Sequence, residues 1–397
     1  MRVSTLTMQQ STVANLLQQQ AELSRTQNEV ASGRKLQSPA DDPAGATRAI
    51  DLQRALSASE QFASNSSIAT NRLSFEEQAL ADAGNVLQRV RELALQANNS
   101  VLDDTSRRMI NAELTSRVQE LVDIANRQDA GGEYLFSGLR TGTQPFGRTA
   151  GGVAYYGDSA GRYVQVGTTQ RVADAHSGYE AFVAVAAGNG DFTTAASGTN
   201  TGNGIIDTGT IVNRANWVPG TYTIRFTAPT TYEVRDAANT LVTSGTYQSE
   251  GSIAFLGARV AISGTPATND TFTVAPAGSE DIFTTLDRLV TTVDQSTQSP
   301  QAKAQFGTSM GGLIQQISQG IDHLLNVRAE VGSRLSAIDS ATTARENLDI
   351  ELKSSLSEIT DVDYAEAITR MNSQLVNLQA AQQSYARMAQ LSLFDYL

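Results

Sequence analysis

The sequence predicts a mainly α-helical fold with a β-rich domain inserted near its middle, in which both ends of the chain build a long-helix coiled-coil bundle. Residues 1–140 and 281–397 carry apolar residues at helical spacing. Residues 141–280 are instead rich in Gly, Thr, Tyr and Val, and apolar and polar side chains alternate there. The helical regions also contain apolar residues that recur every seven positions, which is typical of a coiled-coil seam. The β-rich region therefore separates two halves of one helical architecture.

Length and composition limit the classes of protein to consider. At a typical ~150 residues per domain, 397 residues indicate two or three domains. The absence of cysteine excludes a disulfide framework and a thiol nucleophile. A formal net charge of −12 would repel a polyphosphate backbone, so we expect no nucleic-acid partner. Since no apolar run approaches ~18 residues and residues 1–10 contain no signal-peptide core, we also expect no membrane partner and no cleaved signal.

Seven-residue spacing predicts the helices of the bundle. In the last third of the chain, one heptad position is occupied by Ile317, Leu324, Val331, Ile338, Leu352 and Ile359. Leu73, Leu80 and Leu87 form a matching series in the first half. Ile110, Leu114 and Leu121 mark a further helix. We expect three or four long helices here, and an ordinary bundle core explains most of these positions.

Both ends of the chain bear apolar stripes with no evident partner except each other. The predicted assembly interface consists of the residues on these stripes: Leu6, Val13, Leu16, Leu23, Val30, Ile368, Met371, Leu375, Leu378 and Tyr385. Two such helices bury one face each, whereas many copies packed side by side bury several faces, so the pattern favours self-assembly. The alternative is a two-helix hairpin docked on the bundle of its own chain.

Polar breaks separate the end helices from the bundle. Asp41, Asp42 and Pro43 interrupt the first half, and Asp361 and Asp363 interrupt the second. We interpret them as paired hinges, although helix capping explains the same residues. The predicted domains are a terminal coiled-coil domain (1–40 and 362–397), a helical bundle (41–140 and 281–361) and the β-rich insert (141–280). Further helix starts are predicted at Asp103 before Asp104, at Ser299 before Pro300, and at Ser279 before Glu280 and Asp281.

Short strands are predicted inside the insert. Tyr222, Ile224 and Phe226 alternate with polar residues, which indicates a half-buried strand. Residues 232–234 and 241–242, separated by a turn at 236–239, read as a hairpin.

The two ends resemble the bacterial flagellin superfamily. Residues 31–44 (ASGRKLQSPADDPA) resemble its N-terminal hinge signature, and residues 355–367 (SLSEITDVDYAEA) resemble its C-terminal junction. Residues 132–138 (GEYLFSG) with 143–146 (TQPF), and the final LSLFDYL at 391–397, favour the hook-filament junction family, hook-associated protein type 3. Within the insert, segments 262–266 and 270–274 resemble the family's strands more loosely, with Asn269 where glycine is expected.

The resemblance implies a structural protein of the flagellum, located outside the bacterial cell and exported without a cleaved signal. It implies assembly with copies of the same chain into a ring or tubular layer, with the terminal helices inside and the β domain facing solvent. The implied partners are another hook-associated protein on the hook side, flagellin on the filament side, and an export chaperone. The alternative is a flagellin filament subunit, which would polymerise alone into long filaments.

Recognition by an innate immune receptor is a less favoured alternative. Residues 88–94 (QRVRELA) and 110–114 (INAEL) resemble the flagellin segments that this receptor recognises, with Arg89, Leu93 and Glu113 at the matching positions. We expect these three residues mainly to make lateral contacts between subunits.

No catalytic pattern is evident. The chain contains two histidines, His176 and His323, and a lone histidine is more often a packed or surface residue than a base. It contains no H-E-x-x-H zinc motif, P-loop or G-x-S-x-G elbow. We therefore expect no enzymatic activity, no cofactor and no metal.

Overall fold

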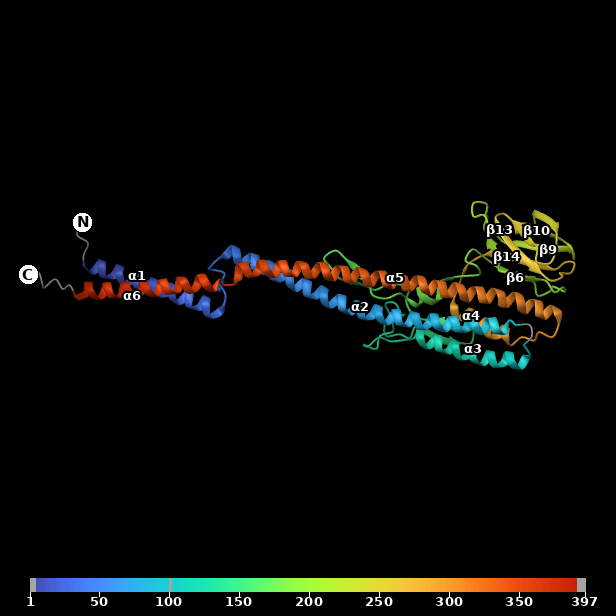
Figure 1. Cartoon of the computed structure of the whole chain (residues 1–397), viewed down its shortest axis with the longest axis horizontal. Coiled ribbons are helices and arrows are strands. Elements are labelled where there is room, and N and C mark those ends of the chain that lie inside the picture. The colour runs from blue at the N-terminus through green and yellow to red at the C-terminus, as the bar shows by residue number, and fades with distance from the viewer. Residues whose placement is uncertain (1–4, 100–101, 391–397) are drawn as a thin grey trace, which may run out of the picture. The chain divides into compact units, whose positions relative to one another are not determined.

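The computed structural model describes residues 5–99 and 102–390, and it shows a mainly helical chain with an inserted β-rich part (Figure 1). The helices are α1 (Thr5–Ser32), α2 (Pro43–Ala97), α3 (Asp104–Ala125), α4 (Ile282–Val293), α5 (Pro300–Thr360) and α6 (Tyr364–Gln390). By their contacts the residues form two compact units. One contains the residues up to Ser64 and those from Ser340 onward, and the other is Asn65–Asp339. The limits fall inside α2 and α5, and the division into three domains stays a prediction.

The first unit is built around the pair of terminal helices. Helices α1 and α6 pack along each other, although they lie at opposite ends of the chain (Figure 1). The same unit contains the beginning of α2 and the end of α5.

The helical core of the second unit follows the predicted heptads. Leu73, Leu80 and Leu87 on α2 are fully buried, and so are Leu114 and Leu121 on α3. The α5 series is also buried from Ile317 through Ile338. An aromatic cluster continues this core, with the rings of Phe146 and Phe283 centred 5.0 Å apart. The period-of-seven interpretation is therefore confirmed for this part of the bundle.

The β-rich part contains short antiparallel strands. Two pairs of strands, β1 with β2 and β3 with β4, come first and are followed by a π-helical turn. Their bounds are β1 (Phe146–Thr149), β2 (Gly152–Tyr155), β3 (Tyr163–Gln165), β4 (Arg171–Ala173) and η1 (Tyr179–Val183). The remaining strands are β5 (Val185–Ala186), β6 (Phe192–Ala196), β7 (Ile205–Ile206), β8 (Thr210–Ile211), β9 (Tyr222–Ala228), β10 (Thr231–Asp236), β11 (Leu241–Thr246), β12 (Ser252–Phe255), β13 (Ala258–Ser263), β14 (Thr271–Pro276) and β15 (Ser279–Glu280).

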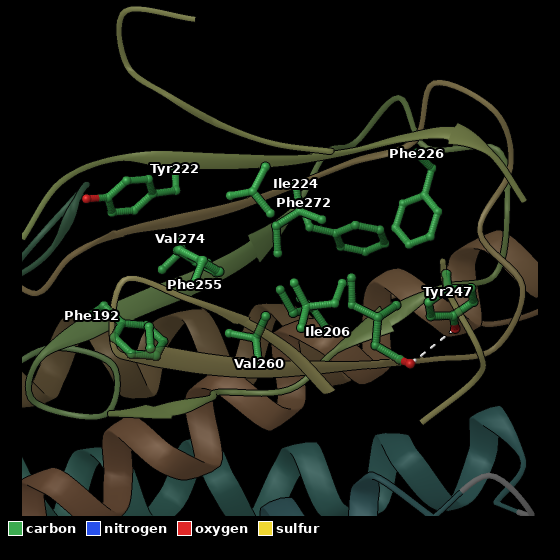
Figure 2. Close-up of a cluster of buried hydrophobic side chains, with 14 residues drawn as sticks. Phe192, Ile206, Tyr222, Ile224, Phe226, Tyr247, Phe255, Val260, Phe272 and Val274 are labelled. Atoms are coloured by element: carbon green, nitrogen blue, oxygen red, sulfur yellow. Dashed lines mark hydrogen bonds between the residues drawn. The ribbon is translucent and has the colours of Figure 1, made fainter. Parts of the chain in front are cut away.

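Two sheets enclose the core of this part. One sheet has the strand order β11-β10-β9-β14-β6, and the other contains β12-β13-β7 with β8 paired to β13. Tyr222, Ile224 and Phe226 all point into the core between them, as their alternation predicts (Figure 2). At one end of this core, the Tyr247 hydroxyl donates a hydrogen bond to the Ile262 carbonyl at 3.1 Å (Figure 2). The predicted hairpin is confirmed as β10 and β11, which pair antiparallel.

The predicted turn and cap residues have mixed outcomes. Asn269 adopts a left-handed φ of +71°, a conformation that asparagine tolerates better than most residues, so the turn keeps the glycine-like geometry without glycine. The caps at Asp103 and Ser299 are confirmed by hydrogen bonds from the Ser106 and Ala302 amides at 2.8 and 3.0 Å.

The predicted helix start at Ser279 is wrong. Ser279 and Glu280 form β15, which pairs with β5, so their backbone is extended. Asp281 instead caps α4 by accepting a hydrogen bond from the Thr284 amide at 2.7 Å. A carboxylate with an extended backbone is a strong helix cap, and it places the helix start two residues later than predicted.

Candidate assembly site

Most of the predicted assembly residues lie within the seam of the terminal pair. Leu23 is buried, and six others are partly covered: Leu16, Val30, Met371, Leu375, Leu378 and Tyr385. Val13 and Ile368 remain exposed. The side chain of Leu6, like the whole 391–397 motif, lies outside the described residues. A lone chain thus covers much of the predicted stripe, and the role of these residues between copies stays a prediction.

Two apolar residues that the sequence analysis did not single out remain on the outside of the pair. Leu17 is 62% exposed on α1, and Val376 is 63% exposed on α6. Each directly follows a seam residue, Leu16 or Leu375. Since successive helical residues are turned by ~100°, the second member of each apolar doublet points out of the seam. The doublets Leu16-Leu17 and Leu375-Val376 were the signal that could have identified them.

An ion pair joins the two terminal helices. The Glu29 carboxylate on α1 is nearly fully buried and lies 2.6 Å from the Arg370 guanidinium on α6. Arg25 contacts Glu29 at 3.4 Å and Asp41 at 3.0 Å. Because the Glu29 carboxylate has lost much of its water, its pairing with Arg370 favours one register of α6 on α1.

The two polar breaks are hydrogen-bonded to each other. The Lys35 amide donates to the Thr360 carbonyl at 2.8 Å, and the Val362 amide donates to the Gly33 carbonyl at 3.0 Å. These bonds flank an isolated bridge between Arg34 and Asp361. Hydrogen bonds from the Ser357 and Thr360 hydroxyls lower the pKa of Asp361. We call this set of backbone bonds the junction clasp, and it makes the two breaks a single structural element.

The aspartates of the breaks also cap helices. Asp42 accepts a hydrogen bond from the Gly45 amide at 2.9 Å and is followed by Pro43, the first residue of α2. Asp363 accepts from the Ala365 amide at 2.9 Å at the start of α6. Asp41 accepts from the Ser38 amide in the same loop. The capping interpretation thus agrees with the geometry, and a hinge motion at these residues stays a prediction.

Gly33 is the most constrained position of the junction clasp. Its φ is +70°, and a Cβ there would lie 2.9 Å from the Tyr364 hydroxyl oxygen. We therefore expect Gly33→Ala to lower the free energy of unfolding by about 1–2 kcal/mol. Thermal unfolding followed by circular dichroism measures this. The control is Gly84→Ala in α2, where a Cβ meets no atom within 4 Å and we expect a gain of about 0.5–1 kcal/mol. Equal effects of the two variants would contradict the strain at Gly33.

Arg89, Leu93 and Glu113 lie on α2 and α3, but they do not form one exposed surface. The Arg89 guanidinium donates to the Glu113 carboxylate at 3.0 Å, which raises the pKa of Arg89 and lowers that of Glu113. Arg89 lines a polar groove of about 870 Å³ between the two helices. Leu93, in contrast, is 1% exposed. The prediction of a surface contact is therefore wrong for Leu93, because its side chain is buried in the bundle core.

Within the described ranges, no group of three or more His, Asp or Glu side chains could hold a metal ion. The helices in those ranges also include none that is long and apolar enough to cross a membrane.

Comparison with known proteins gives the class of protein first. The family model of the bacterial flagellin N-terminal helical region matches residues 3–141, and that of the C-terminal helical region matches residues 314–397. Residues 195–276 match the D2-like domain of flagellar hook-associated protein 1. The two long-helix ends with a β-rich insert are therefore those of the flagellin superfamily.

Individual relatives then give the family. The chain is 38% identical to Xanthomonas campestris FlgL, with 77% of this chain and 99% of that chain covered and a TM-score of 0.73. The flagellar junction protein FlgL from Legionella pneumophila gives 29% identity, 79% and 100% coverage, and a TM-score of 0.72. Flagellar hook-associated protein 3 of Salmonella typhimurium is 22% identical over 396 residues, which covers 100% of this chain and 99% of that protein. The chain belongs to the flagellar hook-associated protein 3 (FlgL) family, and it is a structural protein of the bacterial flagellum.

Proposed function

We propose that this protein joins the flagellar hook to the filament by packing its terminal helices among copies of the same chain. The observation that carries the proposal is that four apolar side chains, Val13, Leu17, Ile368 and Val376, stay exposed outside the α1–α6 seam, and we call this set the outward apolar stripe. An apolar surface on both helices of a pair gains free energy when neighbouring pairs cover it. A ring or tubular layer is an arrangement in which every copy covers its neighbour.

The contacts inside the terminal unit suit this role. The Glu29–Arg370 pair favours one register of α1 against α6, so the outward residues of both helices keep a fixed relation. The junction clasp connects the end of α1 to the start of α6 by backbone hydrogen bonds. The pair would therefore enter an assembly as one preformed element, which lowers the ordering entropy lost on association.

The proposed partners follow from this role and from the names of the relatives. One relative is a hook-associated protein, and another is a junction protein. We propose that this chain contacts another hook-associated protein on the hook side and flagellin on the filament side. We also propose export without a cleaved signal, with a chaperone that covers the apolar stripes before assembly.

Immunogold labelling of intact flagella tests the proposal. A junction protein should give label confined to the boundary between hook and filament. Label along the whole shaft would contradict the proposal and support the flagellin alternative. Purified protein provides a second test, since a flagellin subunit should form long filaments alone, whereas this chain should not.

A further inference from the structure

Both histidines of the chain fasten the same short segment. The segment 174–183 follows β4, contains η1 and leads into β5. His176 lies within it, between α2 and α5, and His323 on α5 contacts its backbone. The His323 Nε2 atom is 2.7 Å from the Glu180 carbonyl oxygen. Both imidazole side chains of the chain therefore act at one place in the fold.

The imidazole of His176 lies between two carboxylates. Its Nδ1 atom is 2.7 Å from Glu76 Oε1 on α2, and its Nε2 atom is 3.1 Å from Glu330 Oε2 on α5. The His176 backbone amide also donates to Glu76 Oε1, at 3.0 Å. His176 is 4% exposed, and Glu76 is completely buried.

With both carboxylates ionised, this arrangement requires a proton on each ring nitrogen. A carboxylate oxygen accepts hydrogen bonds, and a neutral imidazole has only one N–H to donate. The second nitrogen of a neutral ring would direct its lone pair at a carboxylate oxygen. The imidazolium donates to both oxygens and supplies the positive charge that the buried Glu76 requires.

The neighbouring cations are paired with other carboxylates, so His176 supplies the positive charge beside Glu76. Arg72 lies one turn before Glu76 on α2, but its guanidinium contacts Asp129 at 2.7 Å and Glu133 at 3.1 Å. Asp174, in the segment itself, contacts Arg162 at 2.5 Å. Arg334 on α5 lies 3.4 Å from His176 Nδ1 and opposes the positive charge, while it contacts Glu330 at 3.7 Å.

We propose that a buried imidazolium at position 176 clamps the segment 174–183 between α2 and α5, and that alkaline pH opens its α5 side first. The asymmetry comes from the two carboxylates. Glu76 has no access to water, so the single N–H of a neutral ring stays with it. The Glu330 side chain is 65% exposed and can turn into solvent once Nε2 has lost its proton. The proposal goes beyond assembly, since it concerns the isolated chain.

The direction of the pH effect follows from the same contacts. Burial lowers the pKa of His176, but the hydrogen bond and charge of Glu76, together with Glu330, outweigh burial and the opposing Arg334, and the pKa is raised above its ordinary value. A raised folded-state pKa means that the stabilisation is fully present below about pH 6.5, the unfolded value. The stabilisation is lost as the pH rises through the folded-state pKa.

Nuclear magnetic resonance of the imidazole nitrogens in the full chain carrying His323→Gln tests the proposal, because His176 is then the sole histidine. At pH 7 both ring nitrogens should give the signals of protonated nitrogen, and the titration midpoint should lie above 6.5. A neutral ring at pH 7, or a midpoint at or below 6.5, would overturn the proposal.

A second variant tests whether the contact on the α5 side opens first. In the same background, Glu330→Gln should lower the midpoint and raise amide hydrogen exchange in residues 174–183. Asp322→Asn is the matched control, because it removes one exposed charge from α5 about 12 Å further along the helix. An identical midpoint in the two variants would contradict the contact with Glu330. If Glu330→Gln unfolds, the pH dependence of exchange in the His323→Gln chain decides, since exchange there should rise with pH beyond the intrinsic rate.

Discussion

Replacing Leu17 and Val376 together with aspartate is expected to abolish assembly while the chain stays folded. Both side chains are exposed in the lone chain, so the charges meet water and cost little there. In an assembly that covers this stripe, each carboxylate would be desolvated without a partner, which costs several kcal/mol per copy. The same cost recurs at every copy, so we expect complete loss of the junction and not a partial one.

Genetic complementation measures this effect. Cells in which this double variant is the only copy should be non-motile and should release flagellin into the medium, while the purified variant keeps the thermal unfolding of the native chain. The control is Gln20→Asp with Asn377→Asp, which adds the same charges to exposed polar positions on the same helices. If the control abolishes the junction equally, added charge is the cause and not the apolar stripe.

Local patterns in the sequence were sufficient for the elements themselves. Each of these elements is defined by residues that lie close together in the sequence. Examples are the leucine heptads on α2, the cap at Asp42 and the β10–β11 hairpin. Side-chain period and capping chemistry operate over the same distance, and the structure agrees with them. The predicted helix start at Ser279 was wrong because Asp281, two residues later, is a competing helix cap.

Contacts between residues that are far apart in the sequence leave no local pattern from which they could be predicted. The junction clasp joins Lys35 to Thr360, and the His176 clamp uses Glu76 and Glu330, so neither could be inferred from neighbours in sequence. Leu17 and Val376 were missed for a different reason. Where two apolar residues are adjacent, as in Leu16-Leu17, the heptad pattern does not decide which one faces the seam, because that depends on the partner helix. Leu93 was predicted to lie on the surface because its segment resembles a flagellin segment. Such a resemblance in sequence does not show whether a side chain is buried.

Arg72→Ala is expected to cause the largest loss of stability among single substitutions outside the apolar core. The guanidinium is nearly fully buried, donates to the Tyr134 carbonyl at 2.9 Å and contacts the Asp129 carboxylate at 2.7 Å. Its Nε atom lies 4.0 Å from Asp174, whose side chain has no exposure to solvent. Removing the cation leaves Asp129 without its counter-charge, whereas Asp174 keeps the closer guanidinium of Arg162 at 2.5 Å. We expect a decrease of about 3–5 kcal/mol in the free energy of unfolding.

Urea unfolding of the full chain measures the Arg72 effect, with hydrogen exchange in residues 127–135 as the local readout. Arg54→Ala is the matched control, because Arg54 on α2 pairs with Asp51 at 3.4 Å with both side chains exposed, and we expect less than about 0.5 kcal/mol from it. Arg72→Lys should fall between the two, since an ammonium keeps the charge but lacks the fork that reaches both Asp129 and the Tyr134 carbonyl. Equal stabilities of Arg72→Ala and Arg54→Ala would show that the loop 127–135 is held by its apolar contacts. In that case the positive charge of Arg162 would be sufficient for the carboxylates that contact Arg72.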